Sequence, residues 1–265
     1  MNRLKQTFDR LKKTNDRALV GFVTAGDPDV ETSLRLIRAM LENGVDILEL
    51  GIPFSDPSAD GPVIQRSSLR ALKHGVCLQT VMGMIRRIRI FSNAPLIIFS
   101  YYNPIMAYGL DKFHPDAQGA GADGVLVVDL PLEESNELTC RWNDPDFSFI
   151  NLVAPTTPKD RMANIAAASS GFIYMVSKTG VTGSDGLDTS EIGEQMRILR
   201  SVTDLPVCVG FGISTPEDVA AVAQMADGVV IGSAFERLIE ENLENPDLAA
   251  VIGDRTAAYK AKTKK

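Results

Sequence analysis

The sequence predicts an α/β protein, a single (β/α)8 TIM barrel over residues 1–265 with an N-terminal helix covering the bottom of the barrel. Short, almost continuous apolar runs recur along the chain, which is typical of parallel strands buried on both faces. Stretches with apolar residues at helical spacing lie between these runs, so the pattern is a repeated βα unit. A chain of 265 residues has room for eight such units, and no break in composition favours two domains.

The first element is a predicted helix, because Leu4, Phe8 and Leu11 share one face of a charged segment. This segment lacks the apolar core of a secretory signal, and no apolar run reaches the roughly 20 residues that a membrane span requires. Eight predicted strands follow, at residues 19–25, 47–50, 96–99, 124–128, 149–154, 172–176, 207–209 and 228–231.

A helix is predicted over residues 31–43, between the first two strands. Residues 43–47, 120–124 and 225–228 resemble one another, and each segment stands between a helical stretch and an apolar run. Eight parallel strands with crossover helices close more readily into a barrel than into an open sheet. An open doubly wound sheet is the alternative, but residues 24–28 do not form the GxGxxG fingerprint expected after its first strand.

The composition narrows the classes of partner. The formal net charge is −7 and the Lys and Arg residues are scattered, which argues against a nucleic-acid surface. Cys77, Cys140 and Cys208 show no paired spacing, so we expect reduced thiols, a cytoplasmic protein and no metal site. The basic residues 260–265 are predicted to form a solvated tail.

The strongest catalytic signal is an acidic segment at residues 49–62. Glu49 lies in an apolar run that reads as a buried strand, so its carboxyl group has either a raised pKa or a partner. Asp56 and Asp60 follow in a loop punctuated by proline and glycine. The alternative is an ion pair at a strand end followed by ordinary turn residues.

Three glycine-bearing turns follow the last three strands, at residues 180–183, 210–214 and 232–233. Glycine lets the backbone approach an anion, and the N–H groups at a helix start attract it. Ser233 opens a predicted helix over 234–240 and adds a hydroxyl donor. Three such turns at successive strands favour a phosphate site, although each glycine taken alone fits a tight turn equally well.

Together, several segments resemble the tryptophan synthase alpha subunit family: residues 22–28, 49–65, 101–104, 180–183 and 210–214. The resemblance runs from the N-terminal helix to the eighth strand. The acidic segment is highly specific for this family, whereas the glycine turns are shared by many phosphate-binding barrels.

The resemblance implies a carbon–carbon lyase that cleaves indole-3-glycerol phosphate to indole and glyceraldehyde 3-phosphate by a retro-aldol step. It also implies a beta subunit that binds pyridoxal phosphate and joins the indole to serine, in an alpha2beta2 heterotetramer. We therefore expect no cofactor in this chain, and neither a nucleic acid nor a membrane as partner.

The same resemblance assigns site residues by their positions in this sequence. The implied catalytic residues are Glu49, Asp60 and Tyr174, and the implied phosphate-binding residues are Gly183, Gly212, Gly232 and Ser233. The implied indole pocket is formed by Phe22, Phe99, Tyr101, Leu126 and Phe211, and Thr182 is implied in loop closure. The implied partner interface contains Pro53, Asp56, Pro57, Asn103 and Pro104.

Some positions depart from the family pattern. Lys178 stands where many relatives have Arg, Ser58 where Leu or Val is frequent, and Glu236 with Arg237 replaces a common Val-Lys pair. Three rival interpretations remain. A barrel of the indole-glycerol-phosphate synthase type requires a catalytic Lys on a strand, which no predicted strand offers. A catalytically silent subunit and a free-standing lyase that releases indole are the other two.

Overall fold

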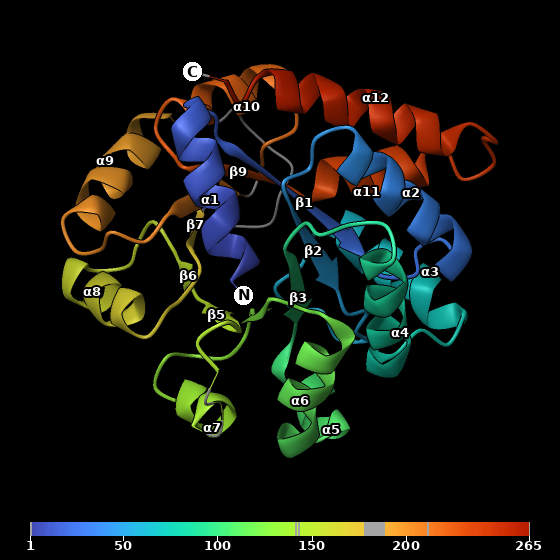
Figure 1. Ribbon diagram of the computed structural model, residues 1–265, viewed down its shortest axis with the longest axis horizontal. Helices are drawn as coiled ribbons and strands as arrows, with labels where there is room; N and C mark the ends of the chain where they lie inside the picture. The colour runs from blue at the N-terminus through green and yellow to red at the C-terminus, as the bar shows by residue number, and fades with distance from the viewer. Residues whose placement is uncertain (1, 141, 143, 178–188, 211, 265) are drawn as a thin grey trace.

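The structure, a computed structural model, describes residues 2–264 except 141, 143, 178–188 and 211. Its strands form one parallel sheet at the centre, and its helices lie around the outside (Figure 1). The strands of the described residues are β1 (Ala18–Thr24), β2 (Ile47–Gly51), β3 (Leu96–Ser100), β4 (Gly124–Val127), β5 (Ser148–Ile150), β6 (Leu152–Val153), β7 (Ile173–Val176), β8 (Val207–Gly210) and β9 (Gly228–Ile231).

The sheet closes into the predicted barrel. Its strand order is β5-β4-β3-β2-β1-β9-β8-β7-β6, and its two end strands follow each other in the chain. The prediction of one continuous strand over residues 149–154 is wrong. The structure has two short strands there, β5 and β6, separated at Asn151. β5 pairs with β4 and β6 pairs with β7, so the interruption lets the chain change its partner. The Asn151 side chain donates to Ser169 Oγ at 2.9 Å at this break.

The helices follow the strands as a βα repeat requires. They are α1 (Arg3–Thr14), α2 (Val30–Glu42), α3 (Pro62–Lys73), α4 (Leu78–Arg89), α5 (Tyr102–Tyr108), α6 (Leu110–Ala120), α7 (Ser135–Thr139), α8 (Lys159–Ala167), α9 (Thr189–Arg200), α10 (Pro216–Ala223), α11 (Ser233–Glu240) and α12 (Leu248–Ala261). The predicted helix over 31–43 is confirmed as α2, and the helix predicted after Ser233 is confirmed as α11.

The alternation of side chains along each strand creates two cores. One set of strand residues packs against the helices, as Leu19 and Leu48 do. The alternate set, which includes Val20, Ile47 and Ile97, fills the interior of the barrel. Because parallel strands are buried on both faces, their sequences read as continuous apolar runs.

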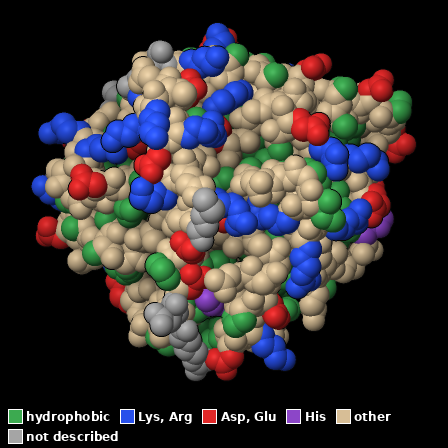
Figure 2. Space-filling model, in the orientation of Figure 1, with side chains coloured by type: hydrophobic (Ala, Val, Ile, Leu, Met, Phe, Trp, Pro, Cys, Tyr) green, Lys and Arg blue, Asp and Glu red, His purple; other side chains and the backbone are tan. Residues whose placement is uncertain are grey.

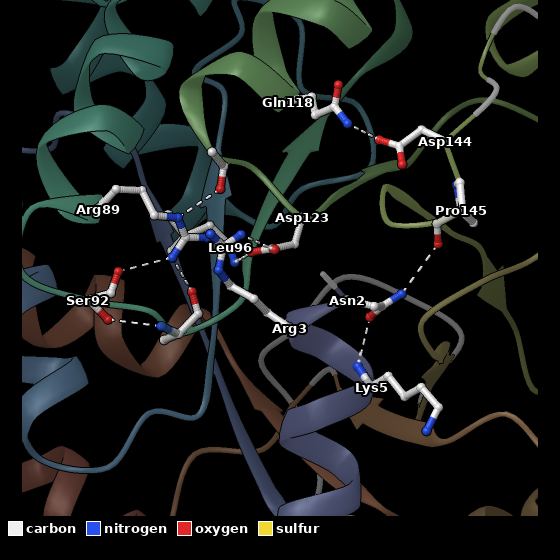
Figure 3. Close-up of polar contacts among 12 residues, drawn as sticks. Asn2, Arg3, Lys5, Arg89, Ser92, Leu96, Gln118, Asp123, Asp144 and Pro145 are labelled. Atoms are coloured by element: carbon white, nitrogen blue, oxygen red, sulfur yellow. Dashed lines mark hydrogen bonds and ion pairs between the residues drawn. The ribbon is translucent and has the colours of Figure 1, made fainter.

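Helix α1 covers the bottom of the barrel, as the sequence predicts. Leu4 and Leu11 are buried in the interior core, and the Phe8 ring lies 6.0 Å from the ring of Phe172. Figure 3 shows how charge fixes this helix: Arg3 and Arg89 donate to opposite oxygens of Asp123, at 2.8 and 2.6 Å. Asp123 directly precedes β4, so the N-terminal end of β4 is joined to α1.

The C-terminal segment is not a solvated tail, so that prediction is wrong. Lys260 lies in α12 and its Nζ is 2.6 Å from an oxygen of Asp46, which precedes β2. Thr263 is buried, and Arg17 N–H donates to its carbonyl oxygen at 3.0 Å. Lys260 therefore forms a long-range ion pair with Asp46, which the local composition of the C-terminal segment does not indicate.

Charged side chains of both signs lie on the face that carries α1 (Figure 2). In the upper left of this view, over α1, Lys and Arg side chains predominate, and a few Asp and Glu side chains lie among them. Within the described part of the chain, every helix is too short or too polar to cross a membrane.

Candidate active site

A cavity that is partly open to solvent lies at the C-terminal ends of the strands. Barrel enzymes place their chemistry at this end, where loops from several strands converge. The cavity is lined by Phe22, Glu49, Asp60, Gly61, Ile64, Phe99, Tyr174, Gly212, Ile213, Val230, Gly232 and Ser233. Eight of the residues singled out from the sequence are therefore brought together from segments far apart in the chain.

Glu49 is a carboxyl group inside the barrel. It lies on β2 between Phe22 on β1 and Ile97 on β3, and its side chain is fully buried. Neither of its carboxyl oxygens has a hydrogen-bond partner among the described residues. Burial raises the pKa of Glu49 to about 8, so the group is a neutral acid near pH 7 that can donate a proton into the cavity.

Asp60 lies on the loop between β2 and α3, at the edge of the cavity. Burial raises its pKa to about 6, while a hydrogen bond with Tyr101 acts in the opposite direction. The Tyr101 hydroxyl also accepts a hydrogen bond from the Ala59 N–H at 2.9 Å. Asp60 is therefore largely ionised at neutral pH, and Tyr101 holds the loop that carries it.

Tyr174 reaches the cavity from β7 and is buried. Burial raises the pKa of Tyr174 well above its usual value, and the charge that nearby Glu49 carries when ionised raises it further. The hydroxyl group of Tyr174 is therefore neutral and lies close to the Glu49 carboxyl group.

Aromatic rings form one wall of the cavity. The rings of Phe22 and Phe99 meet edge to face with their centroids 5.2 Å apart. Leu126 is buried in the interior core and Tyr101 is buried beside the loop, but neither lines the cavity. Phe211 lies outside the described residues. The wall is apolar and aromatic, which suits an aromatic ligand.

The turns after β8 and β9 offer backbone donors to the cavity. Gly212 has a φ of 75°, a conformation that favours glycine, and Gly232 directly precedes α11. The first backbone hydrogen bond of α11 runs from the Phe235 N–H to the Gly232 carbonyl, so the N–H groups of Ser233 and Ala234 precede it and can receive an anion. Gly183 and Thr182 lie outside the described residues, as does Lys178.

The residues assigned to a partner interface lie beside the cavity. Asp56 and Asn103 are exposed, Pro57 and Pro104 are half-buried, and Pro53 is buried. They belong to the loop before α3 and to the start of α5, and the ring of Phe54 in that loop lies 5.2 Å from the ring of Tyr101.

Sequence reasoning missed four lining residues: Gly61, Ile64, Ile213 and Val230. Val230 could have been found, because it alternates with Gly228 on the predicted strand 228–231 and stands two positions before Gly232. Ile64 lies in the first turn of α3, and local pattern alone does not distinguish it from a core residue.

Comparison with known proteins decides the family. The model of the family described as "Tryptophan synthase alpha chain" matches residues 8–263. The chain belongs to this family. A tryptophan synthase alpha chain from Desulfosudis oleivorans is 62% identical over 264 residues, with all of both chains covered. One from Desulfatibacillum aliphaticivorans is 60% identical with the same coverage.

Solved structures agree with this assignment. The tryptophan synthase subunit alpha of Legionella pneumophila has a TM-score of 0.91 at 38% identity, covering 99% of this chain and 98% of that one. A chain of the Mycobacterium tuberculosis tryptophan synthase structure has a TM-score of 0.91 at 33% identity, covering 100% and 99%. The alpha chain described here is thus an enzyme subunit of the lyase tryptophan synthase, and its TIM barrel is the fold of its family.

Proposed function

We propose that this alpha chain cleaves indole-3-glycerol phosphate to indole and glyceraldehyde 3-phosphate, with Glu49, Asp60 and Tyr174 as its catalytic residues. The observation that supports this most is the carboxyl group of Glu49, which is fully buried, unpaired among the described residues and directed into the cavity. A structural ion pair would have given this group a partner, whereas a group that transfers protons needs a free one.

Glu49 moves both protons of the reaction. As a neutral acid it protonates the indole ring carbon that bears the side chain, and the positive charge develops on the ring nitrogen. The Glu49 carboxylate then removes the proton of the hydroxyl group on the carbon attached to the ring. The carbon–carbon bond breaks, its electron pair returns to the ring to give indole, and the hydroxyl-bearing carbon becomes the aldehyde.

Asp60 stabilises the positive charge on the ring nitrogen, because its pKa of about 6 leaves it ionised at neutral pH. The neutral hydroxyl group of Tyr174 assists near the reacting carbon, beside Glu49. The two carboxyl groups therefore divide the work, since their environments hold them in opposite protonation states.

The remaining residues orient the substrate. Phe22 and Phe99 pack against the indole ring, and Tyr101, Leu126 and Phe211 complete its surroundings. Gly212, Gly232 and Ser233 receive the phosphate with Gly183, while Thr182 acts in loop closure. These roles follow the family resemblance, and the lining of the cavity supports those of Phe22, Phe99, Gly212, Gly232 and Ser233.

The indole passes to a beta subunit, which binds pyridoxal phosphate and joins the indole to serine in an alpha2beta2 heterotetramer of the cytoplasm. Pro53, Asp56, Pro57, Asn103 and Pro104 contact this partner. The exposure of Asp56 and Asn103 next to the cavity supports this placement, because an intermediate that passes directly requires neighbouring sites.

The test is an assay of the purified chain on indole-3-glycerol phosphate, with and without a beta subunit. We expect indole formation that increases when the beta subunit is added, and its loss in Glu49→Gln with the fold and substrate binding retained. Turnover in Glu49→Gln would contradict the proton-transfer role. No turnover by the unmodified chain under either condition would reject the enzyme, and equal turnover under both would favour a free-standing lyase.

A further inference from the structure

Glu236 is a fully buried carboxyl group on α11, one helical turn after Ser233. One of its oxygens, Oε1, accepts a hydrogen bond from the N–H of Thr24 at 2.6 Å, at the C-terminal end of β1. For the other oxygen, Oε2, the described residues supply no donor. A buried carboxylate with an unpaired oxygen is costly, so this environment favours the protonated form.

Asp27 is the buried carboxylate whose charge acts on Glu236. The guanidinium group of Arg70 donates to both of its oxygens at 2.7 and 2.8 Å. Burial raises the pKa of Glu236 well above its usual range, and the charge of Asp27 raises it further; the Thr24 N–H and Arg70 act in the opposite direction. A proton on Glu236 removes the repulsion between the two carboxylates, and it supplies a donor for Asp27 from the oxygen that is unpaired in the ionised form.

The pair lies in a network that joins two helices. Arg70 on α3 also donates to Glu240 on α11 at 2.9 Å, and Arg66 donates to both oxygens of Glu240 at 2.7 Å. The hydroxyl groups of Thr24 and Ser67 lie 2.7 Å apart, which joins α3 to β1. Glu236 is thus a central member of a cluster that links β1, α3 and α11.

Two of these elements, α3 and α11, begin at or directly after residues that line the cavity. Helix α3 begins directly after Asp60 and Gly61, at the end proposed for the indole nitrogen. Helix α11 begins at Ser233, at the end proposed for the phosphate. The distance between the two ends therefore depends on how α11 is held against β1 and α3.

We propose that Glu236 is a positioning residue that acts as a neutral acid, joining Thr24 and Asp27 so that α11 presents its N-terminus to the substrate phosphate. Its neutrality also keeps a negative charge away from a site one turn away that binds an anion. This inference rests on the proposed function, and it concerns a residue that departs from the common family pattern.

Two substitutions of Glu236 test whether its hydrogen bonds, and not a negative charge, hold α11 in position. Glu236→Gln keeps an acceptor for Thr24 and gains an N–H donor for Asp27, so we expect kcat and KM for indole-3-glycerol phosphate within about twofold of the unmodified chain. Glu236→Val removes both bonds, and we expect KM to rise about tenfold or more while kcat changes by less than about threefold. Glu31→Gln, which removes an exposed pair with Arg87, is the control and should change neither constant. An unchanged KM in Glu236→Val, or an equally raised KM in Glu236→Gln, would overturn the proposal.

A spectroscopic measurement does not depend on turnover. In a Glu49→Gln protein at neutral pH, we expect an infrared carbonyl band of a protonated, buried carboxyl group that disappears when Glu236→Gln is added. The same band should persist if the chain has no lyase activity, so failure of the proposed function and failure of this inference are distinguishable. Absence of the band would show that Glu236 is ionised and would overturn the neutral-acid assignment, even if Glu236→Val did not fold.

Discussion

Gly210 leaves the space that the hydroxyl group of Tyr174 occupies. A Cβ atom at position 210 would overlap the Tyr174 hydroxyl oxygen and lie 2.7 Å from the ring carbon that bears it. The two residues lie on the neighbouring strands β7 and β8, so the glycine sets where the hydroxyl group stands relative to Glu49.

We expect Gly210→Ala to lower kcat by about tenfold to a hundredfold, because a small displacement of a catalytic group has a large effect on rate. The measurement is steady-state indole formation at saturating substrate. Gly83→Ala is the matched control, since a Cβ atom at Gly83 in α4 meets no other atom within 4 Å. The control should keep kcat and gain roughly 0.5–1 kcal/mol in the free energy of unfolding. Normal kcat in Gly210→Ala would show that the position of the Tyr174 hydroxyl does not limit the reaction.

The pH dependence of kcat/KM is expected to be bell-shaped. Activity should rise as Asp60 loses its proton near its pKa of about 6, and fall as Glu49 ionises near its pKa of about 8. The check is a pH profile at constant ionic strength. A profile that stays level well into alkaline solution would contradict the requirement for a neutral Glu49.

Glu49 should also make the fold less stable as pH rises. Its folded-state pKa of about 8 lies above the ordinary value of 4.5, so the folded chain binds the proton more tightly than the unfolded chain. The contribution of Glu49 to the free energy of unfolding is therefore fully present below pH 4.5 and is lost as pH rises towards 8.

Glu49→Gln removes this dependence, so we expect it to exceed the unmodified chain by about 3 kcal/mol in the free energy of unfolding near pH 7. The difference should almost vanish in acid. Urea unfolding of both proteins at acidic and neutral pH measures it, with Glu31→Gln as a control for an exposed carboxyl group. A stability difference that does not change with pH would mean that Glu49 is ionised in the folded chain.

The barrel could be predicted because its strands are buried on both faces, so their local sequence records the environment directly. Glu49 was recognisable for the same reason, as a carboxyl group inside an apolar run. The interruption at Asn151 could not be recognised from the sequence, because it depends on which strand each half of the segment pairs with.

Pairs of residues that join distant segments could not be predicted from the sequence either. Lys260 is separated from Asp46 by 214 positions, and Glu236 from Thr24 by 212. The residues that neighbour Lys260 and Glu236 in the sequence do not indicate these partners. The family resemblance implies the substrate, whereas the surroundings of Glu236 are seen only in the folded structure.

Substitutions of Ser233 test whether the substrate phosphate binds at the start of α11. A carboxylate at the start of α11 interacts favourably with the helix dipole, so Ser233→Asp should add about 0.3–1 kcal/mol to the free energy of unfolding. The same charge repels the substrate phosphate, and we expect KM to rise about tenfold or more with a smaller change in kcat. Ser233→Ala, which removes only the hydroxyl group, should have a weaker effect on KM. Equal KM values for the Asp and Ala variants would place the phosphate elsewhere.

Tyr101 tests whether the loop of Asp60 is tuned by a hydrogen bond. Tyr101→Phe keeps the ring that packs against Phe54 but removes the hydroxyl group that bonds Asp60 and accepts from the Ala59 N–H. Because this hydroxyl lowers the pKa of Asp60, its loss should move that pKa above about 6.

The acidic limb of the kcat/KM profile should therefore shift towards higher pH in Tyr101→Phe, while the alkaline limb near the Glu49 pKa of about 8 stays in place. Tyr108→Phe is the matched control, because the hydroxyl group of Tyr108 donates to Asp116 at 2.5 Å, outside the lining of the cavity. Its profile should match that of the unmodified chain. An acidic limb that stays in place or moves to lower pH in Tyr101→Phe would mean that another group, and not Asp60, must be ionised for the reaction.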